Sequence, residues 1–272
     1  MSVGQIVNLL KMKVRIVPAM EVGKNYMYLL IDQASKTAAA IDPVVPNKIE
    51  EAAAEEKVKI THLLTTHHHA DHSAGNERMS KLFPGLEIVG GDDRIPAMTK
   101  KVGNGDIFNL GNLKVTCLHT PCHTKGHICY FVSSDSSVEK GENVVFTGDT
   151  LFSGGCGHFF EGTPDQMYRA LIEVLGSLPD ETKVFVGHEY TVNNLKYAAH
   201  VEPNNKKIAE KLLWAQKLQA EDKFTMPSSI GEEKLINPFM RVREERLKKY
   251  TNETDPIKVM GKLRQMKNEF KL

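Results

Sequence analysis

Four apolar, β-branched runs of this chain each lead into a histidine or an aspartate. The runs reach Leu64, Leu118, Phe146 and Val186, and they continue into HHHADH, TPCHTKGH, GDT and GHEY. Short apolar runs that are rich in β-branched residues are typical of β-strands. Strand ends commonly meet at one edge of a sheet, where a rigid scaffold can present functional side chains. The repeated placement predicts a β-rich fold with one shared site at such an edge.

The remaining patterns predict an α+β chain that changes from mainly strands to mainly helices near residue 190. Strands dominate up to His188, and the residues after Tyr190 are helical in composition and spacing, with Pro-containing loops between them. We therefore expect two domains, at 1–190 and 191–272. The expected strands cover 13–20, 25–32, 38–43, 58–65, 113–120, 128–134, 143–149 and 182–188, and the expected helices cover 47–57, 164–178, 193–200, 204–221 and 255–270.

The composition is typical of a globular protein with a substantial core. The chain has 272 residues, of which 41% are hydrophobic and 25% are charged. Its 35 lysines and arginines nearly balance its 34 acidic residues, which leaves a formal charge of +1. No overall field therefore draws the protein to nucleic acid or to an anionic membrane. We expect neither of these as a partner.

The beginning of the sequence and the cysteines indicate an intracellular protein. Residues 1–11 lack the charged start and the long apolar run of a secretory signal, and no stretch approaches the roughly 20 apolar residues of a membrane span. The four cysteines form no CxxC pair, so reduced thiols are expected. We expect a cytoplasmic protein. A mitochondrial form is the alternative, because residues 1–11 could be an alternative start, an organelle signal or a loose arm.

The HHHADH segment offers five potential metal ligands in six positions. In an extended turn, His67 and His69 project to one side and His68 to the other, and Asp71 and His72 follow with a change of direction. Imidazole and carboxylate groups suit zinc, iron and manganese alike, and the two pairs of ligands are too crowded for one ion. We interpret the segment as part of a site for two divalent ions. A proton relay and a solvated polar loop are the alternatives.

Four motifs, in their order and spacing, resemble those of the metallo-β-lactamase superfamily. They are THHHADH, TPCHTKGH, GDTLF and GHEYT. The stretches GDTLFSGGCGHFFEGT, VGHEYT and NPFMRVRE, together with the helical C-terminal region, resemble the glyoxalase II (hydroxyacylglutathione hydrolase) branch. This resemblance implies an αββα sandwich followed by a smaller all-helical domain that binds glutathione. It also implies hydrolysis of S-D-lactoylglutathione to glutathione and D-lactate, the second step of methylglyoxal detoxification.

The resemblance further implies a role for each ligand of a binuclear site. A hydroxide between the ions is the expected nucleophile, because a metal can lower the pKa of bound water to about 7. Zinc is the expected metal, with iron and manganese as alternatives. Asp71 and Asp149 are the expected catalytic carboxylates. The first ion would be held by His67, His69 and His123, the second by Asp71, His72 and His188, and Asp149 would bridge the two.

The same resemblance identifies a set of substrate-binding residues. It places a basic pair on the last helix, where Arg264 and Lys267 share a face because they are three residues apart. Members of the family usually have Lys or Arg where this chain has His158, and a histidine is mostly neutral at pH 7. Core packing is the alternative for the two phenylalanines of the set. The whole set is His158, Phe159, Phe160, His188, Tyr190, Arg264 and Lys267.

Other histidines and one cysteine have simpler interpretations. We expect His62, His119 and His200 to be ordinary core or surface residues. His127 either orients a ligand or packs without a special role. Cys156, between glycines in GGCGH, is interpreted as a small residue in a tight turn and not as a nucleophile.

Two other functions compete with a thioester hydrolase of this kind. A persulfide dioxygenase of the same superfamily would use one iron, and the basic pair Arg264 and Lys267 argues against it. A non-catalytic metal-binding protein is the second alternative, but structural zinc sites are usually closed by four ligands, often cysteines. We therefore expect an enzyme that acts as a monomer on a small-molecule glutathione thioester.

Overall fold

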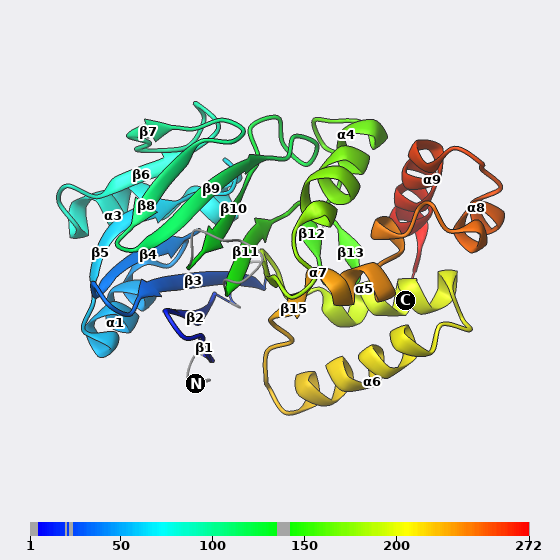
Figure 1. The fold of residues 1–272 in the computed structure, drawn as a ribbon, viewed down its shortest axis with the longest axis horizontal. Coiled ribbons are helices and arrows are strands. Elements are labelled where there is room, and N and C mark those ends of the chain that lie inside the picture. Colours follow the sequence, from blue (N-terminus) through cyan, green and yellow to red (C-terminus); the bar gives the residue numbers. More distant parts are fainter. Residues whose placement is uncertain (1–4, 20, 22–23, 135–141, 272) are drawn as a thin grey trace.

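Two β-sheets pack against each other, and helices cover their outer faces (Figure 1). The structure is a computed structural model that describes residues 5–19, 21, 24–134 and 142–271. The first sheet contains, in spatial order, β1 (Ile6–Asn8), β2 (Met12–Ala19), β3 (Asn25–Asp32), β4 (Thr37–Ile41), β5 (Lys59–Leu64), β6 (Glu87–Gly90) and β7 (Lys100–Lys101). The second contains β15 (Ser228–Ser229), β14 (Lys183–Val186), β11 (Asn143–Gly148), β10 (Ile128–Ser133), β9 (Leu113–His119) and β8 (Ile107–Leu110).

Strand β3 is buried along its whole length because both of its faces are covered. Successive side chains of a strand point to opposite faces. Tyr28 and Leu30 therefore pack in the cluster between the sheets, while Leu29 and Ile31 pack in a second cluster that includes Ile49 of α1 (Pro46–Glu56). A continuous apolar run such as NYMYLLID suits a strand in this position. The αββα arrangement predicted for the first part of the chain is confirmed.

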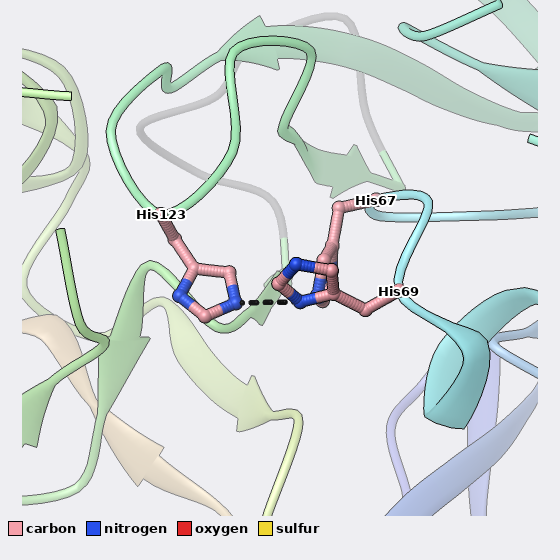
Figure 2. A group of neighbouring side chains, drawn as sticks. All are labelled: His67, His69 and His123. Carbon is pink, nitrogen blue, oxygen red and sulfur yellow. Dashed lines mark hydrogen bonds between the residues drawn. The ribbon is translucent and has the colours of Figure 1, made fainter. Parts of the chain in front are cut away.

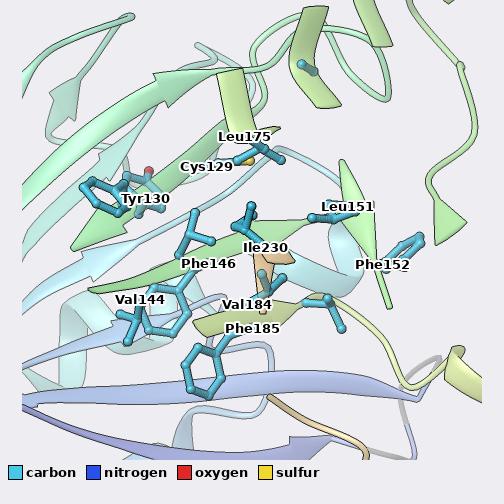
Figure 3. Close-up of a cluster of buried hydrophobic side chains, with 14 of the residues drawn as sticks. Cys129, Tyr130, Val144, Phe146, Leu151, Phe152, Leu175, Val184, Phe185 and Ile230 are labelled. Carbon is cyan, nitrogen blue, oxygen red and sulfur yellow. The ribbon is translucent and has the colours of Figure 1, made fainter. Parts of the chain in front are cut away.

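Aromatic side chains such as Phe146 and Phe185 lie among the buried apolar residues of the second sheet (Figure 3). The ring of Tyr28 lies 5.4 Å from the rings of Phe146 and Phe185, measured between centroids. Its hydroxyl donates a hydrogen bond of 2.5 Å to the carbonyl oxygen of Val186. Large rings contribute much apolar contact area, and the hydroxyl of a buried tyrosine needs a partner. This contact fixes β14 against β3, next to the end of β14 that leads to His188.

The region after residue 190 is mainly helical, as predicted, but it also supplies a strand. β15 pairs antiparallel with β14, with Ser229 opposite Lys183 and Ser228 opposite Val184. A small hairpin of β12 (Leu151–Phe152) and β13 (Gly155–Cys156) lies between the sheets and these helices (Figure 1). The helices of the region are α5 (Thr191–Val201), α6 (Lys206–Ala220), α7 (Ile230–Ile236), α8 (Glu245–Thr251) and α9 (Pro256–Glu269), with a 3-10 turn at Pro238–Met240.

The remaining elements show where the sequence patterns were incomplete. The expected helix at 164–178 begins as α4 (Pro164–Tyr168), continues as a π-helix at Arg169–Val174 and ends as a 3-10 turn at Leu175–Ser177. The helices α2 (Ala70–Ser73), α3 (Asn76–Leu82), α7 and α8, and the short strands β1, β6, β7, β8, β12, β13 and β15, were not predicted. Most of them are four residues long or shorter, which is too short for a clear periodicity.

Candidate metal centre

The predicted ligands meet at one edge of the β-sandwich. His67 follows the end of β5, and Asp149 follows β11 directly. His188 lies just beyond β14, and His123 lies in the loop between β9 and β10. The short helix α2 turns the chain back after His69, so that it carries two further ligands. The shared edge that the strand ends predicted is therefore present.

The seven predicted ligands form three overlapping groups. Within each group, the atoms that could bind a metal lie within 4.8 Å of one another. His68 belongs to none of the groups, and its Nδ1 atom lies 3.7 Å from a carboxylate oxygen of Asp92. The alternation expected for the HHHADH segment is thus observed. The groups are His67, His69 and His123; His67, His72 and Asp149; and Asp71, His72 and His188.

The first group is formed by three imidazoles that lie close together, and Figure 2 shows nitrogens of His123 and His69 turned towards each other. The Nδ1 atom of His69 lies 3.1 Å from Nε2 of His67 and 3.1 Å from Nε2 of His123. Ligands bound tetrahedrally to zinc at about 2.0–2.1 Å are themselves about 3.3 Å apart. The spacing of these three nitrogens therefore suits a divalent ion between them.

The carboxylate of Asp149 lies between His123 of the first group and two further ligands, His72 and His188. Its Oδ2 atom is 3.5 Å from Nε2 of His123 and 3.3 Å from Nε2 of His188. Its Oδ1 atom is 3.3 Å from Nε2 of His72, and it is buried without a hydrogen-bond partner among the described residues. A buried carboxylate oxygen without a donor is costly unless a cation balances it. The residues present therefore fit a divalent metal site.

Asp42 orients His72, and the sequence analysis did not identify it. Its buried carboxylate accepts hydrogen bonds from the backbone N–H of Thr66 at 2.8 Å and from the Thr66 hydroxyl at 2.7 Å. It also accepts from Nδ1 of His72 at 2.9 Å, which leaves Nε2 to face the site. Its φ of 46° is unusual for a residue other than glycine. Asp42 follows the end of β4 directly, which is also where the ligands lie on their strands, but its pairing with His72 depends on how β4 and β5 lie side by side.

His127 holds the backbone of Asp149. Its Nε2 atom accepts a hydrogen bond of 3.2 Å from the backbone N–H of Asp149, and its Nδ1 atom lies 3.0 Å from the hydroxyl oxygen of Thr120. Gly148, just before the aspartate, has a φ of 45°, and an added Cβ would lie 2.8 Å from Nε2 of His127. The geometry favours the orienting role that the sequence left open for His127.

The charge states of the centre suit metal ligands. Burial, and then the neighbouring histidines, lower the pKa of His67 well below its usual value. Burial likewise lowers the pKa of His123 to about 4. For Asp149, burial alone would raise the pKa, but His72 and His188 outweigh it and keep the group ionised. Neutral imidazoles and an ionised carboxylate are the forms that bind metal ions.

His72 differs from the other ligands because three carboxylates surround it. Burial opposes its protonation, but Asp149, Asp42 and Asp71 together raise its pKa to about 9. The side chain of Asn25 donates a hydrogen bond of 2.7 Å to the carbonyl oxygen of Asp71, which fixes the backbone of that ligand. The group of Asp71, His72 and His188 is therefore in the more negative surroundings, and it would gain most from a bound cation.

The predicted basic pair lies on α9 beside the β12–β13 hairpin. Arg264 is only 6% exposed, and it donates hydrogen bonds to the carbonyl oxygen of Cys156 at 2.8 Å and to Asn268 at 2.9 Å. Lys267 donates to the side-chain oxygen of Asn194. Burial, and then the charge of Arg264, lower the pKa of Lys267 to about 7. Arg264 is thus engaged with the protein backbone, whereas Lys267 contacts a side chain.

The GCGHFF stretch forms part of the rim around the first group. The exposed ring of His158 stacks on Phe160 at 5.2 Å and 12°, and Phe160 contacts the ring of His123 at 5.1 Å. Phe160 is 64% exposed, whereas Phe159 packs partly against the core. Burial, followed by the charges of Arg264 and Lys267, lowers the pKa of His158. The structure therefore places Phe160 and His158 at the rim, and Phe159 mainly in packing.

The structure also shows the surroundings of Tyr190 and Cys156. The ring of Tyr190 stacks on that of His188 at 4.6 Å and 4°, and Phe152 packs edge-on against both. Burial raises the pKa of the Cys156 thiol. A thiol must ionise to act as a nucleophile, so this supports the interpretation of Cys156 as a small packed residue.

Comparisons with known proteins agree with these motifs and this geometry. The metallo-beta-lactamase superfamily model matches residues 22–188, and the model of the hydroxyacylglutathione hydrolase C-terminus matches residues 189–270. A hydroxyacylglutathione hydrolase-like protein of Gallus gallus is 48% identical over 96% of this chain and 91% of its own length. The chain belongs to the hydroxyacylglutathione hydrolase family.

Another relative supports this assignment, and a solved structure supports the fold. The cytoplasmic hydroxyacylglutathione hydrolase of Arabidopsis thaliana is 46% identical over 96% of this chain and all of its own length. The crystal structure of ETHE1 from Myxococcus xanthus has a TM-score of 0.65, with 24% identity, and covers 100% of this chain and 92% of that one. In the described part of this hydroxyacylglutathione hydrolase family member, no helix is long and apolar enough to cross a membrane.

Proposed function

We propose that this protein hydrolyses S-D-lactoylglutathione to glutathione and D-lactate, with two divalent metal ions in its active site. The observation that carries the proposal is the position of Asp149, whose carboxylate lies between two groups of potential ligands. The names of the relatives at 46–48% identity support the substrate, because both name a hydroxyacylglutathione hydrolase.

The ligands divide between the two ions by their position. The ions, proposed to be zinc, would supply a water molecule that ionises near neutral pH and positive charge for the developing oxyanion. Asp149 would reach both ions. Asp42 would hold the ring of His72 in position, and His127 would hold the backbone of Asp149. The first ion would be held by His67, His69 and His123, and the second by Asp71, His72 and His188.

The residues around the ions would bind and orient the thioester. Lys267, and to a smaller extent Arg264, would attract the carboxylates of glutathione from α9. Tyr190 and Phe160 would border the acyl and thiol parts of the substrate. The ring of Tyr190 lies against His188, and that of Phe160 lies against His123. The departing thiolate is comparatively stable because a thiol has a pKa of about 8.5, so no separate general acid is needed.

The proposal extends to domain organisation, assembly and location. Two domains at 1–190 and 191–272 are supported by the adjoining family matches, which meet between residues 188 and 189. A cytoplasmic location is proposed from the name of the Arabidopsis thaliana relative, and the protein is proposed to act as a monomer. Light scattering of the purified protein would test the monomer.

One combined experiment tests the activity and the number of ions. Elemental analysis would give the metal content of the purified protein, and loss of the thioester absorbance of S-D-lactoylglutathione would give the rate. About two metals per chain together with thioester loss is the expected result. One iron per chain with oxygen consumption would instead indicate a dioxygenase, and metal without turnover would indicate a non-catalytic protein.

A further inference from the structure

The β12–β13 hairpin links the metal centre to the C-terminal helices. It covers Leu151 to Cys156, so it begins two residues after Asp149 and ends two residues before His158. Each of its strands is only two residues long, and it pairs with neither main sheet. A hairpin of this size has little stability of its own. Something outside it must fix its conformation.

Four buried polar side chains of the C-terminal region bond to the hairpin backbone. Asn237 donates to the carbonyl oxygens of Phe152 and Gly155, at 3.1 and 3.0 Å. Glu233 accepts from the N–H of Gly154 at 2.8 Å, and the two side chains bond to each other at 3.0 Å. The complete set is Asn194, which donates to Ser153, together with Glu233, Asn237 and Arg264, which donates to Cys156.

These bonds replace the neighbouring strand that the hairpin lacks. Buried backbone N–H and C=O groups must be paired, because an unpaired group loses its hydration without compensation. Glu233 and Asn237 are both 0% exposed, so water does not compete for their hydrogen bonds. Side chains of α7 and of the turn after it thus determine where the hairpin backbone lies.

The hairpin is connected to the metal ligands at both of its ends. At the end of β13, the N–H of Gly157 donates to the carbonyl oxygen of Thr150 at 3.3 Å. A Cβ at Gly157 would lie 1.9 Å from the carbonyl oxygen of Asp149, so the two segments are in close contact. The backbone carbonyl oxygen of the next residue, His158, accepts a hydrogen bond of 3.0 Å from Nδ1 of His123. Displacement of the hairpin would therefore shift Asp149 and His123 together.

We infer that Glu233 and Asn237 are positioning residues for the metal centre, and that they act through the β12–β13 hairpin. The C-terminal region then has two roles, since it fixes Asp149 and His123 as well as binding substrate. The catalytic part of this inference rests on the proposed function. The part that concerns metal affinity does not, because it follows from contacts within the protein.

Zinc affinity of the full-length protein tests the inference. After chelation, zinc would be titrated back in competition with a chromophoric chelator, and kcat and KM would be measured with S-D-lactoylglutathione. We expect Asn237→Ala and Glu233→Ala to bind zinc at least tenfold more weakly. We also expect kcat to fall at least tenfold while KM stays within twofold. Glu233→Gln keeps an acceptor for Gly154 and should stay within about threefold of the wild-type affinity.

Asn205→Ala is a matched control for general loss of stability. Asn205 also caps a helical turn of the C-terminal region and bonds to a backbone carbonyl, that of Leu235, but it does not touch the hairpin. It should lower the melting temperature of the metal-free protein without weakening zinc binding. Equal loss of zinc affinity in Asn205→Ala would overturn the inference, as would wild-type affinity in both alanine variants.

Two milder variants keep the test decisive if the alanine variants do not fold. Glu233→Asp retains the carboxyl group but shortens the side chain by one methylene, so it should weaken zinc binding severalfold while Glu233→Gln does not. Equal zinc affinity in this pair would contradict the role of the Gly154 contact. If the wild-type protein left the thioester intact, the proposed function would fail, but the differences in zinc affinity would still be measurable.

Discussion

Nδ1 of His72 lies 2.9 Å from a carboxylate oxygen of Asp42, and both side chains are buried. The same histidine presents Nε2 to His188 at 3.2 Å, on the opposite side of its ring. Asp42 therefore selects the tautomer in which Nε2 carries its lone pair towards the site. Together with Asp149 and Asp71, it also raises the pKa of His72 despite the burial of the ring.

Asp42→Asn tests this relationship. The amide keeps the shape of the side chain but removes the charge, and it can present an N–H to the histidine in place of an acceptor. We expect the zinc affinity of the group formed by Asp71, His72 and His188 to fall by about 10–100-fold, as is typical when the partner of a metal-binding histidine is changed. The chelator competition measures this directly. Asp92→Asn is the control, since Asp92 is also buried near the site but its carboxylate pairs with Arg94 and lies near His68, which is not among the candidate ligands.

Asp149→Ala should abolish hydrolysis and lower the metal content. Its carboxylate lies within 3.5 Å of His123 on one side and of His72 and His188 on the other. Elemental analysis and the thioester assay give the two readouts. His68→Ala is the matched change within the HHHADH segment and should leave the metal content near that of the wild type. Two metals and a normal rate in Asp149→Ala would rule out a bridging role.

Lys267→Ala should weaken binding of the glutathione part of the substrate. A charge-assisted hydrogen bond contributes about 1.5–3 kcal/mol, so KM should rise roughly tenfold or more while kcat changes little. The single change is more informative than loss of the whole basic pair, because Arg264 also holds the backbone of Cys156. Lys262→Ala, an exposed change on the same helix, should leave KM unaltered. An unchanged KM in Lys267→Ala would remove this residue from the binding site.

His158→Lys should lower KM at pH 7–8. Burial and the nearby cations lower the pKa of His158, so its imidazole is neutral above that lowered pKa and becomes positive only below it. Lysine carries its charge across this whole range and restores the cation that the family usually has. The ratio of wild-type to variant KM should therefore be largest at pH 7–8 and should decrease towards pH 5. A ratio near one at every pH would show that position 158 does not contact the substrate.

Much of the metal centre could be predicted because its signals are local. The spacing within HHHADH separates His68 from its neighbours, and the strand ends indicate which distant residues join the group. The role of Asp42 could not be predicted in the same way. It depends on β4 lying parallel to β5 with Ile41 opposite Leu64, and such a pairing is a property of the whole sheet.

The roles of the substrate-binding residues could be predicted only in part, for a similar reason. Helical spacing predicts that Arg264 and Lys267 share a face, and the structure places both beside the hairpin. It does not predict that the guanidinium bonds to a carbonyl 108 residues away in the chain. Likewise, Phe160 is exposed whereas Phe159 packs partly against the core, and nothing in two adjacent phenylalanines indicates which one faces solvent.

The pairing of β15 with β14 affects how the protein can be synthesised and shortened. Until Ser228 and Ser229 leave the ribosome, β14 is the outermost strand of the second sheet, although its Val184 and Phe185 are already core residues. An uncovered strand edge is a template for aggregation, and the N-terminal part of a chain folds first during synthesis. A fragment that stops at residue 190 would keep this edge permanently open. Residue 190, where the chain changes from mainly strands to mainly helices, is therefore a poor place to truncate the protein for expression.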